Sequence, residues 1–156
     1  MDDGETQRVM DEAVGIAKQQ PGGTLATVHA EDGTPYLSFV LFHLRDDGSV
    51  LFGSGNSPQH TRNMQATPEV SFLVDNRNVI DADIEAFERI FIIGHVEPVP
   101  VDAPEYPEYL RELENKHRYA RVMSETGHMY RIRPRRIILM KGLEPQRYVV
   151  NFERRD

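Results

Sequence analysis

Cysteine and tryptophan are both absent from this chain of 156 residues. Without cysteine, disulfides, thiol nucleophiles and thiolate metal sites are excluded, while the redox compartment stays undecided. An excess of basic charge is also missing: the formal net charge is −7, which argues against a general nucleic-acid binder. No apolar run approaches the ~18–20 residues that span a bilayer, and the acidic start MDDGETQRVMDEA lacks a signal-peptide core. We therefore expect a cytoplasmic protein that binds neither nucleic acid nor membrane.

What the chain does contain is typical of a globular domain. Hydrophobic residues make up 39% and charged residues 28% of the sequence, and its length suits one domain with a real core. Apolar residues recur with helical spacing over 5–20, and Pro21 with the two following glycines ends that pattern. We expect a single domain over 1–156, with a helix within 1–22 and a β-rich part over 23–156.

The β-rich part consists of short segments with strand character, separated by turns. Asp32-Gly33 and Asp47-Gly48 are hairpin signals, and Gly94 predicts a bulge or a close backbone approach. A surface helix, or two short ones, is expected over 106–124, and 76–85 is expected to be a loop. Tight turns between the first strands favour an antiparallel barrel or sandwich over parallel winding. The expected strands are 24–30, 35–44, 49–54, 69–75, 87–96, 129–133, 136–141 (joined to the previous one at Pro134) and 148–152.

The second of these strands, 35–44, is largely apolar on both faces. One face can meet the core of a small domain, so the other needs separate cover. We expect a partner subunit or a flat ligand to provide it.

The segment 51–74, LFGSGNSPQHTRNMQATPEVSFLV, predicts a strand, a polar turn, a short helix and another strand. The turn contains Ser54, Asn56 and Ser57. A serine N-cap at Ser57 with Pro58 as the first helical residue is a strong start signal, because proline lacks a donor where a helix has unpaired donors. Pro68 cannot continue the helix, which is therefore short.

His60, Thr61 and Arg62 then fall in or near the first turn of this helix. Free backbone N–H groups, hydroxyls and a guanidinium around one point make a natural site for a phosphate or another anion. The alternative is an ordinary capped helix whose His60 and Arg62 side chains are solvated.

Other clusters of polar residues carry weaker signals. The six histidines are scattered without metal-ligand spacing, so we predict no metal site. Asp81, Asp83 and Glu85 read as a solvated loop, because the calcium-loop pattern is absent. The basic run 131–136 is interpreted as a charged strand edge, with Arg131 or Arg133 reaching a partner subunit's cofactor as the functional alternative.

Three segments together resemble a known family: GTLATVHAEDGTPYLSFVLFHL, GSGNSPQHTRNMQATPEVSFLV and ERIFIIGHVEPV. They are similar to the pyridoxamine 5′-phosphate oxidase-like superfamily of FMN-binding split β-barrels. The run HTRNM followed by PEVSFLV resembles its HTRN-type branch, which includes haem-utilisation proteins and small flavin-binding relatives. The resemblance extends from about Gly23 to Val99 and weakly beyond.

The resemblance implies a mainly β fold, a split antiparallel barrel, that forms a homodimer with the cofactor in a groove between two barrels. It places a phosphate among Ser54, His60, Thr61 and Arg62, while Asn63 orders the loop. On the second strand it implies that Ser38 faces the cofactor and that the backbone at Val40 and Leu41 lines the ring system.

The implied function is an FMN-binding oxidoreductase that exchanges electrons with a small molecule, with no acid or base assigned. The alternatives are a reductase that uses the deazaflavin coenzyme F-420 and a non-enzymatic carrier of flavin or haem. Vitamin B6 oxidases carry Trp-Gly-Arg and Arg-His signatures where this chain reads KGLEPQRY, which argues against oxidation of pyridoxamine phosphate. Gly142-Leu143-Glu144 replaces the Gly-Phe-Gly of the haem-degrading branch, and His60 replaces the lysine of the deazaflavin users.

Overall fold

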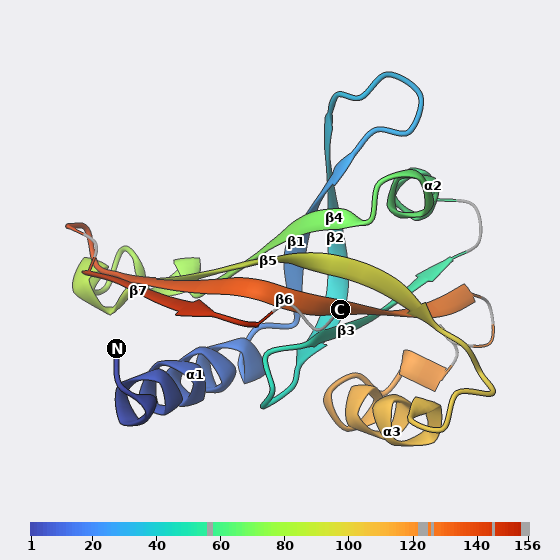
Figure 1. Ribbon diagram of the computed structural model, residues 1–156. Coiled ribbons are helices and arrows are strands. Elements are labelled where there is room, and N and C mark those ends of the chain that lie inside the picture. The colour runs from blue at the N-terminus through green and yellow to red at the C-terminus, as the bar shows by residue number, and fades with distance from the viewer. Residues whose placement is uncertain (56–57, 122–124, 126, 145, 154–156) are drawn as a thin grey trace.

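The fold is a closed antiparallel β-barrel with helices at both ends (Figure 1). The computed structural model describes residues 1–55, 58–121, 125, 127–144 and 146–153. Six strands close the barrel in the order β3-β2-β1-β4-β5-β6, because β3 also pairs with β6, and β7 extends the sheet beyond β6. The strands are β1 (Gly22–Val28), β2 (Pro35–Leu44), β3 (Val50–Gly55), β4 (Glu69–Asp75), β5 (Glu88–Val99), β6 (Gly127–Lys141) and β7 (Gln146–Asn151).

The hairpin signals are confirmed, since β1, β2 and β3 are joined by turns in which Gly33 and Gly48 have φ of 73° and 88°. These positive angles favour glycine, which has no Cβ to clash with the backbone. The aspartate before each glycine braces its turn: Asp47 Oδ1, for example, accepts from the Ser49 backbone N–H at 2.9 Å. Most of the predicted strand ends differ from the observed ones by one to three residues.

One strand expectation is wrong. Pro134 does not separate two strands, because β6 runs unbroken through it and pairs with β5 on both sides of it, from Met129 to Lys141. The register shifts between Ile93 and Gly94, so that Gly94 lies opposite Pro134 and Arg135 is the extra residue of a bulge. A proline has no N–H to donate, and a bulge is one of the few places in a sheet that tolerates it. The expected bulge at Gly94 is confirmed.

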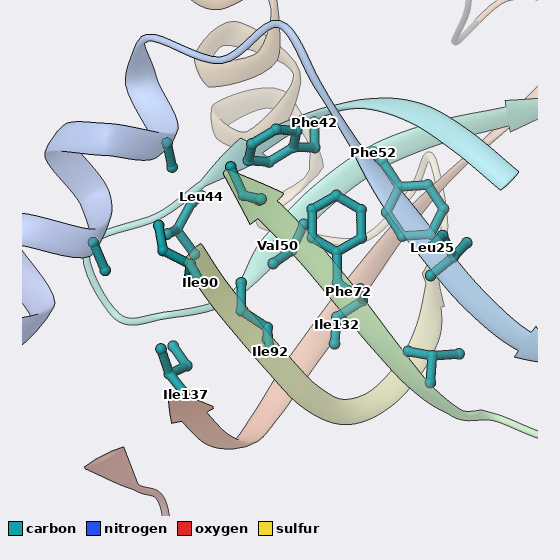
Figure 2. Close-up of a cluster of buried hydrophobic side chains, with 14 of the residues drawn as sticks. Leu25, Phe42, Leu44, Val50, Phe52, Phe72, Ile90, Ile92, Ile132 and Ile137 are labelled. Atoms are coloured by element: carbon teal, nitrogen blue, oxygen red, sulfur yellow. The ribbon is translucent and has the colours of Figure 1, made fainter. Parts of the chain in front are cut away.

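The barrel interior is filled by aliphatic and aromatic side chains from all six strands (Figure 2). Phe42 and Phe72 meet edge to face at 5.1 Å between ring centroids. The fully buried side chains at the centre of this core include Leu25, Phe42, Leu44, Val50, Phe52, Phe72, Ile90, Ile92, Ile132 and Ile137.

The helices α1, α2 and α3 cover the barrel. α1 (Asp3–Lys18) buries Val9, Met10, Ala13, Val14 and Ala17 against the core, and it starts earlier than expected because Asp2 and Glu5 form a capping box. α2 (Gln59–Ala66) adds Met64 to the same core from the β1–β2 side. α3 (Tyr106–Lys116) lies against the outside of β2 and β3 and forms a second, smaller core there.

The remaining segments are short. The expected loop 76–85 contains two 3₁₀ turns, η1 (Arg77–Val79) and η2 (Ile84–Ala86). The expected surface helix, or two short ones, over 106–124 begins as α3, which ends at Lys116. Ala120 and Arg121 are helical again, and positions 122–124 lie outside the described residues.

Candidate functional site

The helix α2 starts immediately after the third strand, as the sequence pattern predicts, but its cap differs. Pro58 is the N-cap rather than the first helical residue: its φ of −61° and ψ of 148° are extended, and it makes no side-chain cap hydrogen bond. The predicted N-cap Ser57 and the turn residue Asn56 lie outside the described residues. Thr67 ends the helix in an extended conformation before Pro68, as expected.

Ser54, at the end of β3, lies at the centre of a chain of hydrogen bonds. Its Oγ is 2.7 Å from His60 Nε2 and 2.6 Å from Thr61 Oγ1. Thr61 Oγ1 in turn donates to the carbonyl oxygen of Gly55 at 2.9 Å. Ser54 and Thr61 are buried, with exposed fractions of 5% and 2%. The structure thus brings three of the predicted site residues together around the start of α2.

The direction of this chain follows from its last member. A carbonyl oxygen only accepts, so Thr61 is the donor to Gly55, Ser54 donates to Thr61, and His60 Nε2 is left to donate to Ser54. This arrangement requires a proton on His60 Nε2. That proton is present in one tautomer of the neutral ring and in the protonated ring. Burial lowers the pKa of His60 below its ordinary value, which favours the neutral ring at physiological pH and leaves Nδ1 as an acceptor.

Asn63 is fully buried and joins α2 to the β1–β2 hairpin. Its Oδ1 accepts from the Ala30 backbone N–H at 2.8 Å and from Gln59 Nε2 at 2.9 Å, and its Nδ2 donates to Thr27 Oγ1 at 3.0 Å. These bonds use both acceptor positions of the amide oxygen. Asn63 therefore fixes the helix on the barrel.

Arg62 is the charged member of the predicted set and lies at the surface, with its side chain 49% exposed. It donates to Gln59 Oε1, and its Nε is 3.6 Å from Glu31 Oε1. Arg62 and Glu31 are both exposed, so their ion pair is weak and exchanges easily with another anion.

The three predicted residues on β2 have different surroundings. Ser38 lies on the inward face, opposite Leu25, and its Oγ is sealed from solvent with no hydrogen-bond partner in the described part of the chain. Val40 is buried on the same face, and Leu41 is half-buried on the opposite face. Leu37 and Phe39, also outward, are each 68% exposed, so one chain alone leaves this predicted apolar face uncovered.

Sequence reasoning missed a polar cluster between β2 and α3. Glu112 accepts from Arg45 Nε at 3.0 Å and lies 3.6 Å from His43 Nε2. Lys116 Nζ donates to the Ala17 carbonyl oxygen at 3.0 Å and lies 3.7 Å from the Phe42 ring centroid, and burial lowers its pKa to about 8. The i, i+4 spacing of the glutamate and lysine marks one helix face but does not identify the strand that the face meets.

The basic run on β6 is engaged within the chain. Arg131 donates to Glu97 and to the Tyr109 hydroxyl, the latter at 2.6 Å, and Arg133 Nε donates to Glu97 at 2.6 Å. β6 pairs with β5 on one side and with β3 and β7 on the other, so the interpretation of this run as a strand edge is wrong. The contacts of Arg131 and Arg133 within the chain speak against their use as cofactor ligands. Within the described ranges, no group of three or more His, Asp or Glu side chains is placed to hold a metal ion. The helices there are all too short or too polar to cross a bilayer.

Comparisons with solved structures extend the picture of the fold. A heme binding protein from Mycobacterium smegmatis superposes with a TM-score of 0.77 at 22% identity, over 91% of this chain and 57% of that one. HutZ, the heme storage protein from Vibrio cholerae, superposes with a TM-score of 0.68 at 19% identity, over 86% of this chain and 96% of that one. An FAD-binding protein from Mesorhizobium loti superposes with a TM-score of 0.64 at 18% identity, over 82% of this chain and 91% of that one. This chain thus spans little more than half of the M. smegmatis protein.

At these identities the likeness shows a shared fold. No curated protein matches in sequence. A family model described as pyridoxamine 5′-phosphate oxidase, however, matches residues 9–141, most of the chain. The chain therefore belongs to the pyridoxamine 5′-phosphate oxidase family, whose split β-barrel it adopts.

Proposed function

We propose that this protein binds FMN through its phosphate at the start of α2 and acts as an oxidoreductase on a small molecule. The observation that carries the proposal is the linked set of Ser54, His60 and Thr61 beside the exposed cation of Arg62. The first backbone N–H groups of a helix have no partner within the helix and favour an anion. The Arg62 guanidinium beside these N–H groups supplies charged donors for a phosphate, while the protons of Ser54, His60 Nε2 and Thr61 are used within their own chain of hydrogen bonds and fix the turn.

The geometry gives these residues different roles in binding the phosphate. Arg62, at the surface, supplies the charge that meets the phosphate, together with backbone N–H groups of the first turn. Ser54 and Thr61 are buried and hold each other, so they fix the turn and keep the His60 ring in place. Bound FMN would supply the electron-transfer chemistry, and the chain's own part is to bind, orient and shelter it.

A second copy of the chain completes the proposal. The outward face of β2 exposes Leu37 and Phe39, and an exposed apolar patch of this kind is typical of a subunit interface or a flat ligand. We infer a homodimer with the flavin ring near this face. A flavin enzyme also requires a small-molecule electron donor and acceptor.

The test is a pair of arginine variants titrated with FMN and with riboflavin, which lacks the phosphate. Arg62→Ala should weaken FMN binding by about 10- to 150-fold, since a charged hydrogen bond is worth ~1.5–3 kcal/mol. Riboflavin affinity should stay unchanged. Arg77→Ala is the matched control, because Arg77 is an exposed arginine that pairs with Asp75 away from α2. Flavin fluorescence quenching measures all four affinities.

Equal FMN affinity in the Arg62 and Arg77 variants would remove the phosphate from the start of α2. Failure of the unaltered protein to bind FMN at all would overturn the proposed function. Oxidation of NADH or NADPH in air with added FMN then decides whether the flavoprotein is an enzyme, because tight binding without turnover is the behaviour of a carrier.

A carrier of haem is the second candidate, favoured by the structural likeness to a heme binding protein and a heme storage protein. The absorption spectrum of the purified protein separates the candidates. A band near ~450 nm indicates flavin, one near ~420 nm indicates a deazaflavin such as coenzyme F-420, and an intense Soret band indicates haem. A titration with haemin that produces no Soret shift would exclude the haem carrier.

A further inference from the structure

A pocket of about 180 Å³ lies between the second half of α2 and the strands β5 and β6, apart from the arginine and histidine at the start of that helix. It would hold about six water molecules at ~30 Å³ each, which is the space of one substituted aromatic ring. Its lining comprises Met64, Gln65, Val96, Pro98, His128 and Tyr130.

Tyr130 is the residue that points to a ligand. The residue is 4% exposed, and its ring stacks on Phe52 with centroids 5.7 Å apart. The hydroxyl has no hydrogen-bond partner in the described part of the chain. The hydroxyl is not sealed from solvent, and Tyr130 lines the pocket. A buried phenol normally bonds to a neighbouring group, and here the place of that neighbour is open.

The state of the phenol and the character of the walls restrict what can bind. Burial raises the pKa of Tyr130, so the hydroxyl stays protonated at neutral pH and acts as a donor. Met64 and Val96 are buried and form an apolar floor, and a thioether makes favourable contacts with an aromatic ring. The Gln65 amide and the His128 imidazole are exposed at the rim, where they can bond to polar substituents.

We propose that this pocket is a second small-molecule site, which takes a single aromatic ring bearing a carbonyl or carboxylate oxygen and binds that oxygen through the Tyr130 hydroxyl. The strand register places it beside the predicted phosphate site, because His128 on β6 pairs with Ser54 on β3. The two sites nonetheless use different residues. Occupation of this pocket therefore does not depend on flavin binding.

The experiment measures binding of benzamide to the full chain without FMN, by saturation-transfer NMR. Tyr130→Phe removes only the hydroxyl and should weaken binding about three- to ten-fold, the value of one hydrogen bond. Tyr148→Phe is the matched control, because its hydroxyl donates to Gln146 on β7, away from the pocket. The non-planar cyclohexanecarboxamide should bind less well than benzamide.

A second variant keeps the test decisive if Tyr130→Phe folds poorly. Gln65 is exposed, so Gln65→Trp can place an indole over the mouth of the pocket without disturbing the core, and benzamide binding should be lost. Absence of saturable binding to the unaltered chain up to about 10 mM, a free energy weaker than about −3 kcal/mol, would overturn the proposal. So would equal affinities in the Tyr130 and Tyr148 variants. Either result leaves the FMN titrations of Arg62→Ala unaffected.

Discussion

At the scale of single residues, the most informative side chains are polar groups that the barrel has buried. Ser54 and Thr61 satisfy each other, and Asn63 satisfies two backbone or side-chain groups of the β1–β2 hairpin. Such groups are costly to bury alone, so they specify one arrangement of α2 on the barrel. The Ser38 hydroxyl, which has no partner in the described ranges, is the exception on β2.

Spacing along the chain anticipated that Ser54, His60, Thr61 and Arg62 surround the start of one helix. Spacing could not show that Ser54 Oγ contacts both His60 and Thr61, because that depends on where the end of β3 lies relative to α2. The Tyr130 pocket was missed for a similar reason. It is formed by three elements distant in sequence, and a tyrosine in a strand usually packs without a pocket.

Glu88 offers a residue-scale test through pH. Burial and the nearby Glu12 carboxylate raise its pKa to about 6 from an ordinary 4.5, with Lys141 opposing the shift. The folded state therefore holds this proton more tightly than the unfolded state, and the stability it gives is present below pH 4.5 and lost as pH rises through about 6. Glu88→Gln should remove this slope and stabilise the protein at pH 7.5 by at most about 1 kcal/mol, since the group is partly exposed.

Urea unfolding midpoints at pH 4.5 and 7.5, compared between the variant and the unaltered chain, measure the effect. Glu85→Gln is a suitable control, because it removes a carboxylate from the neighbouring η2 turn. A variant that keeps the full pH dependence of the unaltered protein would show that Glu88 is not the titrating group.

At the scale of elements, the helix and hairpin expectations succeeded where local signals were complete. The helical spacing of apolar residues in α1 and the two Asp-Gly pairs each identify a structure from adjacent residues alone. The predicted helix and the predicted hairpin turns were both confirmed. The continuity of β6 was missed because a proline within one strand reads as an interruption. Its place opposite Gly94 becomes visible only once β5 is known to be the neighbour.

The bulge itself supplies a prediction. A Cβ at position 94 would lie 2.2 Å from the Arg133 carbonyl oxygen, a backbone atom that cannot move without shifting the strand. Gly94→Ala should therefore destabilise the barrel by about 1–3 kcal/mol, the usual cost of overpacking. Gly15→Ala is the opposite case, because a Cβ there meets nothing within 4 Å and the residue is inside α1. It should stabilise by about 0.5–1 kcal/mol.

Chemical denaturation of both variants measures the two changes, which should have opposite signs. A Gly94→Ala protein as stable as the unaltered one would mean that β5 and β6 separate locally at little cost, and that the bulge does not require glycine.

At the scale of the whole molecule, barrel closure follows from one pairing that no local pattern reveals. β3 meets β6 across about 75 residues of sequence, and this contact converts an open sheet into a barrel. The closed barrel then separates the two faces of β2. Even-numbered residues from Val40 to Leu44 enter the core, while Leu37 and Phe39 remain outside. The expectation of a second covering partner for β2 came from sequence alone and stays a prediction.

A dimer interface on the outward face of β2 can be tested by measuring the mass of the protein in solution. Phe39 is 68% exposed and lies over the backbone of Gly22, with Leu37 and Val28 on the same outward face. A homodimer that buries this face should have twice the 17.9 kDa mass of one chain. Phe39→Asp would place a charge on each side of such an interface without touching the core, and it should raise the dimer dissociation constant by at least about tenfold. Val101→Asp, at a residue 75% exposed on a loop, should leave the dimer intact.

Sedimentation equilibrium separates these outcomes. A monomeric unaltered protein, or a Phe39→Asp protein that dimerises as strongly as the Val101 variant, would remove the second copy from this face. The flavin would then have to be held by one chain, which makes the FMN affinity of the Phe39 variant the decisive companion measurement.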